Sequence, residues 1–145
     1  MKRVIEQVAS FPNVTPADLY ELFMDSTKHS AATGMPAKVR RKVGGKWSAF
    51  GGMILGKTLA LVPNRMIVQA WRSSAFKPGD ADSVLVLTFS GDAKRGKISL
   101  VHVNVPDHDA RGVKQGWPAY YWKPWAAYLA RPAKGGKRKG GKKRR

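Results

Sequence analysis

Three histidines are the side chains of this 145-residue chain that come nearest to acid–base chemistry. His102 alternates with Ile98 and Leu100 along an apolar run, where a histidine is more often a hydrogen-bonded core residue than a general base. His29 lies in a short segment of small residues, and we expect it to cap or brace the mouth of a cavity. The nine acidic residues form no evident acid–base pair, although folding can unite distant ones, so the sequence favours a noncatalytic protein.

Metal and cofactor chemistry finds little support in the residue types. Asp107-His108-Asp109 carries metal-capable side chains directly after Pro106, but without a second group of ligands we interpret it as a solvated loop. The absence of cysteine excludes disulfides, thiolate zinc sites and thiol nucleophiles. The glycine clusters match neither a P-loop nor a dinucleotide fingerprint. We therefore predict neither a metal nor a cofactor.

Apolar and aromatic side chains occupy the positions that alternate toward one face of the expected strands. Such a lining can enclose a small hydrophobic molecule, while Gln69, His102 and tyrosine hydroxyls fix its orientation. The alternative is that the same side chains simply fill the core, since each buried hydrophobic side chain contributes about 1.5–3 kcal/mol. The predicted ligand-binding residues are Phe50, Ile54, Gln69, Trp71, Leu85, Leu87, Phe89, Ile98, Leu100, His102, Trp117, Tyr121 and Trp125.

The elements that hold these side chains begin with a strand over 4–11 and two short helices. Thr15 and Ser26 are the expected N-caps of these helices, and Asp18 is placed to complete a capping box with Thr15. Hairpin-connected strands follow, because apolar runs alternate there with Gly, Pro and Asn turns. Their expected ranges are 38–43, 46–50, 53–62, 66–72, 83–90 and 97–105.

The end of the folded part predicts an aromatic helix. Trp117, Tyr121, Trp125 and Tyr128 follow spacings of four, four and three, which place them on one helical face, and Pro124 should kink or break the helix. A helix this aromatic must pack against a broad apolar surface. The order of elements predicts an α+β domain over residues 1–130, with a curved antiparallel sheet wrapped around the C-terminal helix.

Positive charge is concentrated at the end of the chain, although the net charge is +18 overall and the 43% hydrophobic content excludes a fully disordered polycation. Half of the net charge comes from residues 131–145, which we expect to form a disordered tail. Such a tail can bind nucleic acid or another anionic surface without sequence preference, or it can serve solubility alone. The predicted polyanion-binding residues are Arg131, Lys134, Lys137, Arg138, Lys139, Lys142, Lys143, Arg144 and Arg145.

A second basic cluster, Arg40-Arg41-Lys42, falls within an expected strand. Alternate residues of a strand point to opposite faces, so at most Arg40 and Lys42 act together. We interpret this cluster as a solvated edge strand that is protected against aggregation.

Several segments resemble, in the same order, motifs of the family of activators of the heat-shock-protein-90 ATPase and their homologues, within the START-like (SRPBCC) superfamily. These segments are 25–34 with Pro36-Ala37, 43–52 with Ile54 and Gly56, 67–72, Val105-Pro106, and Gly116-Trp117 with 120–122. The resemblance spans about residues 3–130. It implies the helix-grip fold, in which the sheet and the C-terminal helix enclose an apolar cavity, and it adds a chaperone as an alternative partner.

We therefore predict a START-like domain that binds a small hydrophobic molecule and attaches to polyanions through its tail. Two alternatives are a nonspecific nucleic-acid-associated protein and a chaperone-associated module. No apolar stretch approaches the roughly 18 residues of a membrane-spanning helix, and the basic start of the chain lacks a signal-peptide core. The expected location is the cytoplasm.

Overall fold

The computed structural model describes residues 2–131, whose elements follow the predicted order of strand, two helices, sheet and helix. Their bounds are β1 Lys2–Pro12, α1 Pro16–Met24, α2 Ser26–Thr33, β2 Lys38–Val39, β3 Lys46–Ala49, η1 Phe50–Gly52, β4 Ile54–Val62, β5 Met66–Ser73, β6 Ser83–Gly91, β7 Arg95–Pro106, α3 Asp107–Trp117, η2 Pro118–Trp122 and α4 Lys123–Leu129. The predicted tail lies outside the described residues apart from Arg131, whose guanidinium lies 4.5 Å from the centre of the Tyr128 ring.

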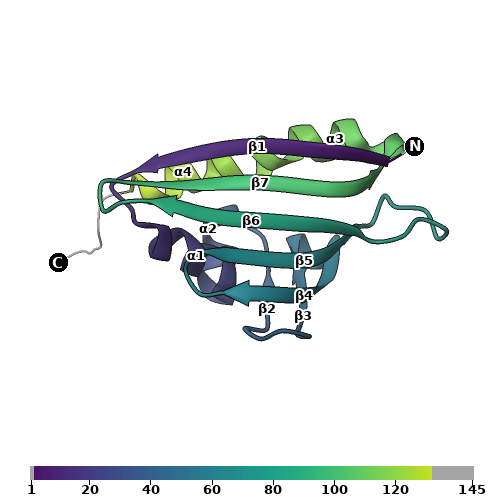
Figure 1. The fold of residues 1–145 in the computed structure, drawn as a ribbon, viewed down its shortest axis with the longest axis horizontal. Coiled ribbons are helices and arrows are strands. Elements are labelled where there is room, and N and C mark those ends of the chain that lie inside the picture. Colours follow the sequence, from purple (N-terminus) through teal and green to yellow (C-terminus); the bar gives the residue numbers. More distant parts are fainter. Residues whose placement is uncertain (1, 132–145) are drawn as a thin grey trace.

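The seven described strands form one antiparallel sheet in the order β1-β7-β6-β5-β4-β3-β2. Figure 1 shows the helices gathered on one face of this sheet, with α3 and α4 running along the β1–β7 side. Side chains of β5 alternate between the two faces, so that this strand buries Ile67, Gln69 and Trp71 against the helices. The predicted α+β helix-grip architecture is therefore confirmed.

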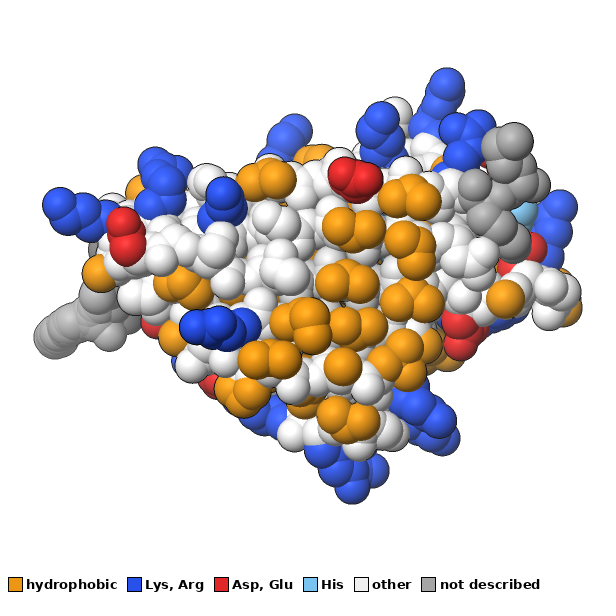
Figure 2. Space-filling view, in the orientation of Figure 1, with side chains coloured by type: hydrophobic (Ala, Val, Ile, Leu, Met, Phe, Trp, Pro, Cys, Tyr) orange, Lys and Arg blue, Asp and Glu red, His pale blue; other side chains and the backbone are white. Residues whose placement is uncertain are grey.

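The other face of the sheet is largely apolar, and no helix of residues 2–131 covers it. Figure 2 shows hydrophobic side chains gathered across its centre with Lys and Arg around them. Val68, Val86 and Val101 lie side by side in one cross-strand row, and the neighbouring Leu55 and Val8 are 52% and 65% exposed. We call this surface the outer sheet face.

The N-cap of α1 is the residue predicted from the sequence, whereas the N-cap of α2 is a different residue. Thr15 accepts a hydrogen bond from the Asp18 N–H, and the Asp18 carboxylate accepts one from the Thr15 N–H, which confirms the capping box. The cap of α2 is Asp25, which accepts from the Lys28 N–H, so the prediction of Ser26 was wrong. The Ser26 hydroxyl instead accepts from the Val39 N–H and ties α2 to β2.

The expected strand over 38–43 is also much shorter than predicted, because only Lys38–Val39 pairs with β3. Arg40 and Lys42 lie in the connection to β3, where they do not share a strand face. Arg41 forms a bidentate ion pair with Glu21 of α1, with N···O distances of 3.0 and 2.6 Å. The basic cluster thus contributes a link between a loop and a helix rather than a protected edge strand.

The C-terminal helical segment starts ten residues earlier than the aromatic spacing suggests. Asp107-His108-Asp109 forms the first turn of α3 rather than a loop, and carboxylates are favourable at the positive end of a helix. As the sequence predicts, Pro124 marks a break in the α-helical hydrogen-bond pattern, because α4 begins only at Lys123. The preceding turn, η2, is π-helical, and Pro124 lies in the first turn of α4, where the ring and the missing N–H of proline are tolerated.

Candidate functional site

A pocket of about 640 Å³ lies between the C-terminal helical segment and the end of the sheet formed by β4 and β5. This volume falls within the range of small-molecule sites in proteins. The lining residues are Thr33, Met35, Phe50, Met53, Ile54, Trp71, Ser73, Ser74, Ala75, Asp109, Gly112, Val113, Gly116, Trp117, Ala119, Tyr120, Tyr121 and Pro124. Most of these side chains are apolar or aromatic, so the pocket suits a hydrophobic molecule.

Five of the residues predicted to bind a ligand line this pocket: Phe50, Ile54, Trp71, Trp117 and Tyr121. The other predicted residues are buried in the core beside the pocket and do not line it. They are Gln69, Leu85, Leu87, Phe89, Ile98, Leu100, His102 and Trp125.

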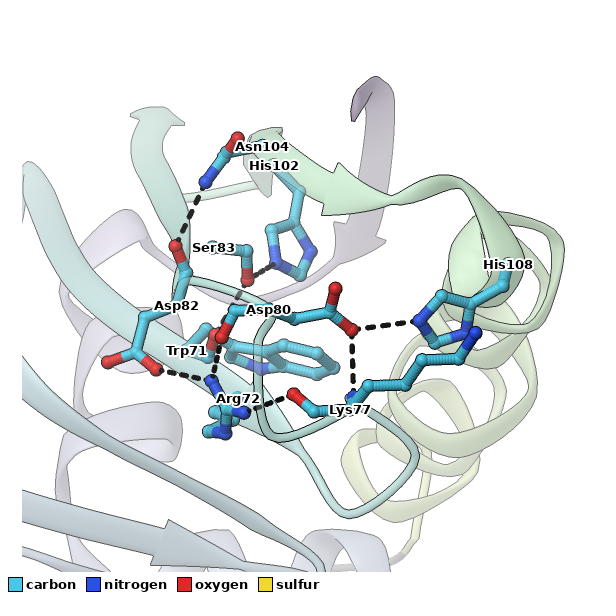
Figure 3. A network of polar contacts seen from close by, with 9 residues as sticks. All are labelled: Trp71, Arg72, Lys77, Asp80, Asp82, Ser83, His102, Asn104 and His108. Atoms are coloured by element: carbon cyan, nitrogen blue, oxygen red, sulfur yellow. Dashed lines mark hydrogen bonds and ion pairs between the residues drawn. The ribbon is translucent and has the colours of Figure 1, made fainter. Parts of the chain in front are cut away.

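His102 joins the sheet to the pocket wall through a chain of hydrogen bonds. Its Nδ1 accepts from the Trp117 indole N–H at 3.2 Å, so the ring hydrogen lies on Nε2, which is 2.8 Å from Ser83 Oγ. Ser83 Oγ donates in turn to the Trp71 carbonyl at 2.7 Å. Figure 3 shows His102 beside Ser83 in this arrangement.

This arrangement leaves His102 without the properties of a general base. Burial lowers its pKa to about 3, and its accepting nitrogen is already engaged by Trp117. The Ser83 hydroxyl gives its hydrogen to a backbone carbonyl, so His102 cannot activate it as a nucleophile. His102 therefore fixes the orientation of Trp117, one wall of the pocket.

A second buried chain holds Tyr121, another wall of the pocket. The Tyr121 hydroxyl donates to His29 Nε2 at 2.8 Å, and His29 Nδ1–H donates to the Phe23 carbonyl at 2.8 Å. Burial lowers the pKa of His29 to about 4, although the bond to the Phe23 carbonyl opposes this shift, and burial raises the pKa of Tyr121. Both histidines are therefore uncharged at neutral pH, and each one holds an aromatic side chain of the pocket wall through a hydrogen bond.

Two glycines on α3 leave the space that the pocket occupies. Gly112 and Gly116 are one helical turn apart and both line the cavity. A Cβ atom at Gly112 would come no closer than 3.5 Å to Asp109 Oδ1, and one at Gly116 would lie 3.4 Å from Tyr120 Cδ2. The backbone therefore tolerates a side chain at either position. The sequence analysis did not identify either glycine as a pocket residue. Their separation of four residues, in the segment that follows Pro106, is a signal that could have indicated one face of a helix without side chains.

The loop between β5 and β6 forms another wall and is held by polar contacts. Arg72 donates to the Asp80 and Lys77 carbonyls at 2.6 and 2.7 Å and pairs with Asp82 at 3.2 Å. The Asp80 carboxylate lies 2.8 Å from Nε2 of His108 on α3. Figure 3 shows that these contacts hold the loop against the start of α3. Ser74 and Ala75 of the same loop line the pocket.

Residues 2–131 contain neither a cluster of metal-ligating side chains nor a helix that could span a membrane. No group of three or more His, Cys, Asp or Glu side chains there could hold a metal ion. Among the same residues, no helix has the length and apolar character needed to cross a membrane.

Comparison with known proteins identifies relatives of this chain in sequence and in structure. Over 104 residues the chain is 32% identical to an activator of 90 kDa heat shock protein ATPase homolog from Dictyostelium discoideum, and over 108 residues it is 28% identical to human homolog 1. These matches cover 71% and 74% of the chain but only 27% and 32% of the relatives, so the chain corresponds to about a third of their length.

The crystal structure of an Hsp90 activator from Plasmodium falciparum superposes with a TM-score of 0.79 at 26% identity, covering 89% of this chain and 97% of the other. Residues 13–130 match the family described as Activator of Hsp90 ATPase homolog 1-like protein. That span includes the helices, the glycine pair and nearly all of the sheet that encloses the pocket. The chain therefore belongs to the Activator of Hsp90 ATPase homolog 1-like family, as the sequence motifs predict.

Proposed function

We propose that this domain binds a small hydrophobic molecule in the pocket between α3–η2 and the sheet. The observation that carries this proposal is a cavity of about 640 Å³ lined chiefly by apolar and aromatic side chains. Hydrophobic burial supplies affinity in such a site, and a few fixed polar groups supply orientation.

The packing around the pocket supports binding over simple core filling. Trp117 and Tyr121 are each held by a buried hydrogen bond rather than by close packing alone. Their rings are thereby kept at the pocket wall, while the glycines of α3 leave the facing space open. The cavity is therefore preorganised, which lowers the entropic cost of binding.

Replacing Gly116 with leucine is expected to close the pocket without unfolding the domain. The new side chain enters the cavity, and leucine is a better helix former than glycine, so the free energy of unfolding should stay constant or rise by about 0.5–1 kcal/mol. Fluorescence titration with the neutral probe N-phenyl-1-naphthylamine should show at least a tenfold loss of affinity.

Gln115→Leu provides the matched control, because it adds the same side chain to an exposed position on α3. This variant should bind the probe like the parent protein. Unchanged probe binding by Gly116→Leu, with folding verified by circular dichroism, would contradict the proposed pocket.

The family relationship favours a second function, association with a chaperone of the Hsp90 class. The relatives at 32% and 28% identity are named as activators of that chaperone's ATPase. Because the chain corresponds to about a third of their length, we propose a chaperone-binding module rather than the relatives' full activity.

A complex between this protein and a purified Hsp90-class chaperone is the expected result of analytical ultracentrifugation at micromolar concentrations. Gly116→Leu should still form the complex if chaperone binding and ligand binding use different surfaces. A chaperone that sediments unchanged in the presence of excess domain would remove this second function.

A further inference from the structure

A single carboxylate lies among the eighteen residues that line the pocket. It belongs to Asp109, which is partly buried in the first turn of α3. Its Oδ2 accepts a hydrogen bond from Ser73 Oγ at 3.1 Å. Its Oδ1 lies on the side of Gly112, another lining residue, and has no hydrogen-bond donor within residues 2–131. One acceptor atom of Asp109 is therefore left at the cavity.

The neighbouring carboxylates differ from Asp109 in having basic partners. Asp107 pairs with Arg3, Asp82 with Arg72, and Asp80 with His108. Within the described part of the chain, no Lys, Arg or His nitrogen lies within ion-pair distance of Asp109. This is notable in a protein with a net charge of +18, where a basic side chain is readily supplied. The Asp109 carboxylate therefore lines the pocket without a basic partner from residues 2–131.

Aromatic rings surround the same space. Phe50, Trp71, Trp117, Tyr120 and Tyr121 all line the pocket. Phe50 makes edge contacts with Tyr120 and Tyr121, at 5.9 and 5.4 Å between ring centres, which joins the rings across η1 and η2. Aromatic side chains offer a large apolar area, against which the alkyl chain of a ligand can pack.

We propose that the pocket selects amphiphilic organic cations, with an ammonium head group near Asp109 and an apolar tail against the aromatic rings. This inference rests on the proposed ligand-binding function and adds the charge of the ligand. The positive charge of an ammonium group attracts the Asp109 carboxylate, and the apolar lining receives the remainder of the molecule.

A purely structural role for Asp109 is the competing explanation. A carboxylate in the first turn of a helix is favourable, and the bond to Ser73 links α3 to the end of β5. Such a role would affect stability and leave the choice between ligands of different charge unchanged. The test must therefore measure selectivity.

Isothermal titration calorimetry of the full chain with three probes built on a ten-carbon chain, each below its micelle concentration, provides this measurement. The probes are decyltrimethylammonium, decanol and decanoate, which share a tail and differ in charge. The parent protein should bind decyltrimethylammonium at least about tenfold more tightly than decanol, and decanoate most weakly. This order opposes the net charge of the protein, which by itself favours decanoate.

Asp109→Asn should reduce the preference for decyltrimethylammonium over decanol to less than about threefold, because the amide carries no charge. Asp107→Asn, in the same helical turn but outside the pocket, is the matched control and should keep the parent preference. Binding of all three probes without a cationic preference, or a preference that survives in Asp109→Asn, would overturn this inference and leave ligand binding intact. Binding of none of the probes would overturn the proposed function itself.

Discussion

Trp125→Ala is expected to lower the free energy of unfolding by about 3–5 kcal/mol, because it removes the largest fully buried side chain of the core. The Trp125 ring contacts Phe11, Phe23 and Tyr121, with 5.8–6.4 Å between ring centres. These contacts join α4 to β1, α1 and η2, so the cavity left by alanine cannot close by a local adjustment. Urea unfolding followed by circular dichroism measures the loss.

Tyr120→Ala is the matched control for this change. Tyr120 is also aromatic and lies five residues earlier in the same helical segment, but it is 62% exposed. Its removal should change the free energy of unfolding by less than about 1 kcal/mol. Equal losses for the two variants would show that the C-terminal segment does not pack as described.

Acidification from pH 8 to pH 5 is expected to lower the free energy of unfolding by about 4 kcal/mol through His29 and His102 together. Both pKa values are lowered by burial, from 6.5 to about 4 and about 3 respectively. Below pH 6.5 the unfolded chain takes up protons at these residues while the folded protein does not, so stability falls with decreasing pH. The loss continues until the pH reaches the folded-state pKa values.

Urea midpoints measured at half-unit steps from pH 8 to pH 5 test this expectation. His102→Gln should remove about half of the pH dependence, at some cost in stability at pH 8 because the bonds to Trp117 and Ser83 are disturbed. His29→Gln should remove a similar share. A pH dependence that survives in the double variant would mean that these histidines are not its source.

The sequence predicts the sheet and the first helices well because their signals are local. The alternation of Leu85 and Leu87 with exposed or half-buried neighbours identifies a strand with one buried face, and Thr15 with Asp18 identifies a helix start. These features depend on residues that are close in the chain. The structure therefore contains both the predicted capping box of α1 and the predicted alternation along β6.

The start of α3 escapes prediction because its sequence lacks a helical signal. Between Asp107 and Gly116 the apolar residues are Ala110 and Val113, too few to define a buried face. Packing against β1 and β7 stabilises this helix instead. The position of the pocket depends on the path of that helix. Alternation along the strands identifies which side chains point inward. It cannot tell which of these inward side chains line the pocket and which are buried in the core.

The Gln69 side chain illustrates the same limit. Its inward position on β5 is evident from alternation, and it suggested a polar contact to a ligand. In the structure it is fully buried, its amide nitrogen lies 3.4 Å from Thr58 Oγ1, and it does not line the pocket. The three-dimensional path of α3 and η2 determines which inward residues face the cavity.

The uncovered valines of the outer sheet face have a consequence for the behaviour of concentrated solutions. Lys57 and Lys97 lie on the outward side of the same strands, so two molecules that meet through this surface bring like charges together. Their mutual repulsion extends roughly 30 Å at 0.01 M salt but only about 3 Å at 1 M. We therefore expect molecules that meet through the outer sheet face to repel one another less as the ionic strength rises.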